Sequence, residues 1–175
     1  MHRLIASVLL LLPLSAPGMF NPSFNNIHIK ELEYWNLTLG PTLSYTAGST
    51  LHGPGIGGGI ALNKLGFSLQ AEFTITRNED GTVPYLDAAS SSILHLGASF
   101  IFFEGGYSRM RLSSGLTANG WHLGLEIPLP LSRDENSLMR FLRVYYRPTW
   151  ISFPGGREVF HEIGISLRFR IMLEE

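Results

Sequence analysis

The residues best suited to chemistry are charged side chains that recur at alternate positions along short apolar segments. Spacing of two places side chains on one face of an extended strand, so the charges of one segment share a face. We interpret this set as a charged network inside a barrel: Glu72, Arg109, Arg111, Glu126, Arg143, Arg147, Glu162, Arg168 and Arg170. Because isolated buried charges are unstable, we expect each glutamate to pair with neighbouring arginines.

Two further pairs could support nucleophilic catalysis. His95 and Ser99 share a face of one segment, and His122 and Glu126 share a face of another. Each pair is four residues apart, which in a strand is about 13 Å and too far for a hydrogen bond. A serine catalyst would therefore need contacts between different strands. We expect no catalytic residue from these pairs.

Other chemistries find little support. The chain has no cysteine, which excludes thiol catalysis, disulfides and cysteine zinc sites. The six histidines have no paired spacing, so we expect no metal site and no cofactor. The glycine-rich stretch 52–59 lacks the Gly-Lys-Ser/Thr ending of a phosphate loop. A net charge of −1 without a basic stripe gives no reason to expect nucleic acid as a partner.

The N-terminus has the layout of an export signal. His2 and Arg3 precede an apolar run over 4–14, and Ser15-Ala16-Pro17-Gly18 follows it. A basic start, a short apolar centre and a small-residue exit are typical of a secretory signal peptide. We therefore predict a cleaved signal peptide at 1–18, a short periplasmic segment at 19–33 and a folded domain at 34–175.

The folded domain alternates apolar and polar residues with a period of two, which predicts β-strands. The clearest examples are 65–76 and 162–171. Eight such segments are expected, at 34–45, 56–63, 65–76, 92–103, 107–112, 121–129, 142–150 and 162–171. We expect short turns at 63–64, 104–106 and 132–137, and longer loops at 46–55, 78–91, 113–120 and 152–159. Alternating short and long connections are typical of the two ends of a membrane barrel.

The composition of the two faces favours a membrane barrel over a soluble one. One face is aliphatic and aromatic, and the other carries the charges together with many glycines and hydroxyls. The chain has only two lysines, although a soluble barrel with a polar outer face would usually carry more. Aromatic residues gather near the segment ends, as in membrane girdles: Tyr34, Trp35, Tyr45, Phe102, Tyr107, Trp121, Trp150 and Phe153. The sequence thus predicts an all-β, eight-stranded, antiparallel up-and-down transmembrane β-barrel.

Over 34–173 this pattern resembles the small outer-membrane β-barrel proteins of Gram-negative bacteria, of the eight-stranded OmpA/OmpX-like type. The resemblance implies a place in the outer membrane, with outer-membrane lipids and the outer-membrane assembly machinery as partners. It rests on the pattern of segments. Such proteins commonly end on an aromatic residue, whereas here Phe169 is followed by Ile171, Leu173 and two glutamates.

Three functions remain open at this stage. The first is a structural or surface-interaction role, with the interior plugged by arginine and glutamate side chains and an extracellular ligand at loops 78–91 and 152–159. The second is a narrow, porin-like channel for small solutes or anions, suggested by the excess of arginines. The third is a lipid A-modifying enzyme. We favour the first because eight strands leave an interior just wide enough for side chains to fill.

Overall fold

The computed structural model describes residues 36–49, 51–64, 67–79, 89–131 and 139–171. The chain divides into two compact units, Met1–Tyr34 and Trp35–Glu175, and every described residue belongs to the second. The predicted signal peptide and periplasmic segment therefore lie outside the described residues. No helix in the described part is long and apolar enough to cross a membrane.

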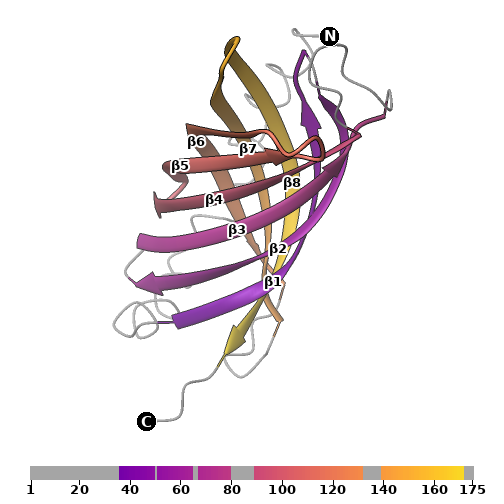
Figure 1. Cartoon of the computed structure of the whole chain (residues 1–175). Coiled ribbons are helices and arrows are strands. Elements are labelled where there is room, and N and C mark those ends of the chain that lie inside the picture. Colours follow the sequence, from indigo (N-terminus) through magenta and orange to yellow (C-terminus); the bar gives the residue numbers. More distant parts are fainter. Residues whose placement is uncertain (1–35, 50, 65–66, 80–88, 132–138, 172–175) are drawn as a thin grey trace, which may run out of the picture. The chain divides into compact units, whose positions relative to one another are not determined.

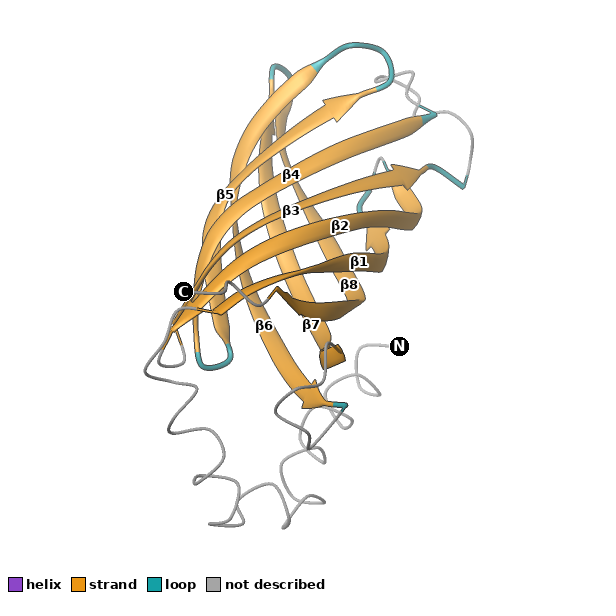
Figure 2. Ribbon diagram, turned by 90° about the horizontal axis from the view of Figure 1, so that it is seen from below, coloured by secondary structure: helices purple, strands orange, loops and turns teal. Residues whose placement is uncertain are grey.

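Eight antiparallel strands form a closed barrel in which each strand pairs with the next and β8 pairs with β1 (Figures 1 and 2). This confirms the predicted all-β, eight-stranded fold. The strands are β1 (Asn36–Ala47), β2 (His52–Lys64), β3 (Phe67–Arg77), β4 (Ser90–Phe100), β5 (Phe103–Leu112), β6 (Thr117–Pro130), β7 (Met139–Phe153) and β8 (Gly156–Ile171). We call the end at which β1 begins the turn end and the opposite end the loop end.

Three of the four predicted long loops are wrong in extent, because the hairpins continue to pair beyond the apolar segments. The predicted loops 46–55, 113–120 and 152–159 shrink to 48–51, 113–116 and 154–155. The connection 78–89 is the longest, as predicted, and most of it lies outside the described residues. The predicted turn at 63–64 is also wrong, because Asn63 and Lys64 pair with Ser68 and Phe67 within the β2–β3 hairpin.

The turn predicted at 104–106 lies at Ile101 and Phe102 instead. Ile101 has a φ of 57°, in the left-handed region that two-residue hairpin turns require but β-branched residues rarely adopt. Glu104 lies within β5, opposite Ser99 and Gly124, and its side chain is buried in the barrel. The ion pairs of Glu104, described below, hold it in the strand and place the turn earlier in the chain.

Pro41 and Pro148 lie inside strands, as their sequence positions predicted, and each interrupts the ladder on one side. Pro41 pairs with Gly58 of β2, but the β1–β8 register skips it between Leu39 and Thr42. Pro148 pairs with β8, and the β6–β7 register skips it in the same way. Because proline has no N–H to donate, a strand interior can hold it only where one neighbour gives up a hydrogen bond.

The register of the strands determines their tilt. We follow each residue to its paired residue on the next strand, starting at Leu37. After one turn around the barrel this path returns to β1 at Ala47, ten residues further along. The path passes through Leu62, Leu69, Ala98, Gly105, Leu123, Pro148 and His161. Leu123 and Pro148 are opposite each other because they lie between the registered pairs His122–Thr149 and Leu125–Tyr146. This offset of about 33 Å along the strands, over about 38 Å around the barrel, gives a tilt of about 40°.

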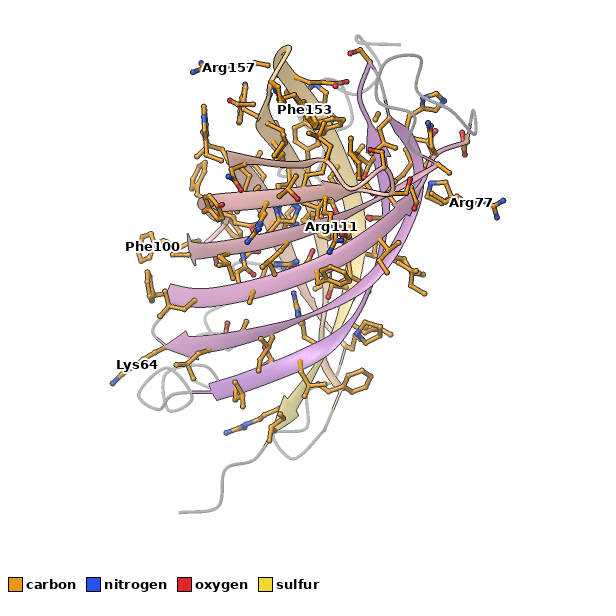
Figure 3. The ribbon with its side chains drawn as sticks, in the orientation of Figure 1. Lys64, Arg77, Phe100, Arg111, Phe153 and Arg157 are labelled. Atoms are coloured by element: carbon orange, nitrogen blue, oxygen red, sulfur yellow. The ribbon has the colours of Figure 1, made fainter. Side chains whose placement is uncertain are left out.

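The inward side chains form two layers. From the turn end to the middle they are polar and charged. At the loop end they include an apolar cluster, which we call the apolar cap and which consists of Leu51, Ile93, Met110, Leu112, Ala118, Ile151 and Phe160, with Leu116 and Phe153 packed against it. Phe153, labelled in Figure 3, meets Phe160 edge to face at 6.2 Å between ring centroids.

Inward glycines make room for the largest of these side chains. A Cβ atom on Gly164 would lie 2.5 Å from the hydroxyl of Tyr145, which is itself buried. We expect Gly164→Val to lower the free energy of unfolding by about 1–3 kcal/mol, through overpacking. Urea titration of the refolded protein in detergent measures this, with Gly155→Ala, which has open space around it, as the control. Equal unfolding midpoints for the two variants would contradict the packing described.

Candidate functional site

Arg147 lies at the centre of the barrel and is fully buried. Its guanidinium contacts three carboxylates, Glu104 at 2.9 Å, Glu72 at 3.1 Å and Glu162 at 3.6 Å. The ring of Tyr145 lies 4.6 Å from the guanidinium carbon, which adds a cation–π contact. One arginine of β7 thus links β3, β5 and β8 across the interior.

Arg143 and Arg168 extend this arrangement toward the turn end. Arg143 pairs with Glu72 and, at 2.9 Å, with Glu126, while Arg168 pairs with Glu72 at 2.8 Å. Glu72 therefore accepts hydrogen bonds from three guanidinium groups. We call these residues the ion-pair network: Glu72, Glu104, Glu126, Arg143, Arg147, Glu162 and Arg168. In a low-dielectric interior such pairing is what makes buried charge tolerable.

A serine between two histidines joins the network. The hydroxyl of Ser108 lies 2.9 Å from Nδ1 of His95 and 2.8 Å from Nδ1 of His122. The outer ring nitrogens reach carboxylates, His95 Nε2 to Glu162 at 3.2 Å and His122 Nε2 to Glu104 at 3.3 Å. The result is a Glu–His–Ser–His–Glu chain that connects β8, β4, β5 and β6.

This chain has the residue types of an acyl-transfer triad, but its members are buried inside the barrel. Ser108, His95 and His122 are at most 2% exposed. The pairs considered from spacing alone do not meet, because each histidine finds its partners on other strands. The hydrogen bonds of both histidines to Ser108, and of His95 to Glu162, satisfy buried polar groups. Among the described residues, no group of three or more His, Asp or Glu side chains could hold a metal ion.

The structure places six of the nine predicted network residues in contact inside the barrel: Glu72, Glu126, Arg143, Arg147, Glu162 and Arg168. Arg170 lies on the same face of β8, half-buried at the turn end. The prediction is wrong for Arg109 and Arg111, which are exposed on the outer face of β5.

The error has a physical cause. The prediction turned all nine charged residues inward, but the inward residues of β5 near the loop end are Met110 and Leu112. The signal that could have corrected it is Tyr107, a girdle-type aromatic residue on the same face as Arg109.

Sequence reasoning also missed five interior residues as members of the site: His95, Glu104, Ser108, His122 and Tyr145. Glu104 was not predicted as an interior residue because the two glycines after it suggested a turn. The histidines have suggestive spacings, but only the strand register shows that they meet at Ser108.

The outer face of the barrel is a second site candidate. Its exposed apolar side chains include Leu39, Leu43, Ile56, Ile60, Leu69, Phe73, Ile75, Leu96, Leu123, Leu125, Ile163 and Ile165. With the tilt above, these residues cover a band about 20 Å high. Phe67, Phe100 and Phe103 are paired neighbours on β3, β4 and β5 near the edge of the band at the turn end.

At the edge of this apolar band nearest the loop end lies an aromatic row. Tyr107, Trp121 and Trp150 are direct neighbours on β5, β6 and β7. The two tryptophan rings stack at 4.1 Å, and Tyr107 donates a hydrogen bond to Asn119 at 2.7 Å. Amphipathic rings of this kind prefer the boundary between hydrocarbon and water.

The role of Arg147 can be tested by removing its charge. We expect Arg147→Met to lower the free energy of unfolding in detergent by about 3–5 kcal/mol, since it leaves buried carboxylates without their central partner. Arg109→Met, at an exposed position, should change it by no more than about 0.5 kcal/mol. Urea unfolding followed by tryptophan fluorescence measures both. A larger loss of unfolding free energy for Arg109→Met would indicate that Arg109 faces the barrel interior.

Comparison with known proteins finds a likeness in structure and none in sequence. No family model matches the chain, and no curated protein matches it. Among solved structures, the barrel is similar to the crystal structure of Neisserial surface protein A, an eight-stranded outer-membrane barrel. The TM-score is 0.50 at 12% sequence identity, and the match covers 78% of this chain and 97% of the other. The chain therefore has the fold of the small eight-stranded outer-membrane barrels.

Proposed function

We propose that the chain is an exported, non-conducting barrel of the outer membrane, with a structural or surface-interaction role. The observation that carries this proposal is the apolar band on the outer face, bounded by aromatic residues at the loop end. Its height of about 20 Å approaches the apolar band of about 25 Å of known membrane barrels. Exposed leucine, isoleucine and phenylalanine side chains on nearly every strand would be a liability in water.

The filled interior argues against a channel. The ion-pair network occupies the middle of the barrel and the apolar cap covers it at the loop end. A conducting path would have to separate buried ion pairs and also pass a dry layer of side chains. The buried His95 and His122 argue in the same way against an enzyme that acts on membrane lipids.

The partners in this proposal are outer-membrane lipids and the machinery that assembles such barrels. The connection 78–89 is the longest between strands and is the candidate for contact with an external ligand. The segment 152–159, of which all but two residues belong to β7 and β8, is the second candidate.

The lipid-facing assignment predicts a contrast between two arginine substitutions on β8. Ile165 lies in the middle of the apolar band and Val159 beyond the aromatic row, opposite Trp150. In lipid vesicles, Ile165→Arg should lower the free energy of unfolding by about 2–4 kcal/mol, and Val159→Arg by about 0–1 kcal/mol. A soluble barrel would tolerate both, since Ile165 would then already face water. Equal, small effects would therefore contradict the membrane assignment.

The filled lumen predicts that the refolded protein does not conduct. Planar-bilayer recordings of the full chain should show no discrete openings, under conditions where gel migration differs between heated and unheated samples and so confirms a folded barrel. Reproducible single-channel steps from such a sample would contradict a lumen blocked by side chains and would favour the narrow channel.

A further inference from the structure

Arg109 and Arg111 are unexplained by the role proposed so far. Both lie on the outer face of β5 and are exposed, although the outer face below them is apolar. Neither guanidinium has an ion-pair partner among the described residues. Arginine near a lipid boundary is stable when it reaches water or an anion, so the position calls for one of these.

The two arginines border a groove of about 330 Å³ on the outer face. Its lining consists of two registered rows across neighbouring strands, Phe73–Leu94–Arg109 and Ser92–Arg111–Thr117. The lower row is apolar up to Arg109, and the upper row consists of two hydroxyls beside a guanidinium. The groove therefore changes from apolar to cationic toward the loop end, where Figure 3 labels Arg111.

The level of the groove coincides with the aromatic row. Tyr107 precedes Arg109 by two residues on the same face, and Trp121 lies opposite Tyr107. With a strand tilt of about 40°, Arg109 lies within about 4 Å of the height of Trp121 and Trp150, and Arg111 about 5 Å above Arg109. The apolar part of the groove thus faces the band, and its cationic part lies at its upper edge.

We propose that this groove binds the phosphorylated headgroup of a lipid in the leaflet at the loop end. The phosphate accepts hydrogen bonds from Arg109 and Arg111, with the hydroxyls of Ser92 and Thr117 beside it, while an acyl chain packs on Phe73 and Leu94. Arginine forks match phosphate oxygens in geometry and charge. The inference rests on the proposed membrane location, because only a lipid presents a phosphate and a hydrocarbon chain at this boundary.

The test uses the full-length protein refolded into phosphatidylcholine nanodiscs. The probes are diphosphoryl lipid A, the same lipid after removal of its phosphates, and inorganic phosphate. Bound lipid is counted by native mass spectrometry over a titration. The variant is Arg109→Gln with Arg111→Gln, and the matched control is Arg157→Gln, an exposed arginine next to the β7–β8 turn.

We expect the unaltered protein to retain diphosphoryl lipid A, and the double variant to bind it about tenfold or more weakly. The Arg157→Gln protein should bind it like the unaltered protein, and the dephosphorylated lipid should bind weakly to all three.

Equal binding by the double variant would overturn the site, and binding of inorganic phosphate as tight as that of the lipid would overturn the lipid as its source. A double variant that inserts with heat-modifiable migration but binds equally well refutes this inference alone. Failure of the unaltered protein to enter nanodiscs refutes the proposed function and this inference together.

Discussion

Arg147 carries its charge in a place that water does not reach, and most of the interior is arranged around that fact. Its attraction to Glu72, Glu104 and Glu162 offsets the loss of hydration only because the three carboxylates come close from different strands. Their positions in turn require the register of the barrel, the early turn at Ile101 and the small residue at Gly164. A single buried charge thus connects the register, one turn and one packing choice.

The outer face follows from a different constraint, the change of surroundings along the barrel axis. Within the apolar band the outward residues are aliphatic and the inward ones polar. On β5 the relation inverts beyond the aromatic row, with Met110 and Leu112 inside and Arg109 and Arg111 outside. Along the ten residues of β5, polar side chains therefore face inward near the turn end and outward near the loop end. The inversion explains how an apolar cluster inside the barrel and two exposed arginines outside it can occur at the same end.

The fold could be predicted from the sequence because a period of two is a local property that each strand displays by itself. The interior could be predicted only in part. Which charges exist is visible in the sequence, but which of them meet depends on a register that shifts by ten residues around the barrel. Ser108 between two histidines is the clearest case, since its partners are 13 and 14 residues away in the chain. Glu104 was missed because local turn chemistry was given more weight than a distant ion pair.

The order of the charges along the chain has a consequence for assembly. The strands β3, β5 and β6 contribute three carboxylates to the ion-pair network, whereas all three arginines reside on β7 and β8. Six paired strands without the last hairpin would hold these carboxylates without their arginines. The final hairpin brings the compensating cations and seals the seam between β8 and β1 in the same step. Closure and neutralisation are thus one event, so a barrel that lacks its last hairpin would bury carboxylates without their arginines.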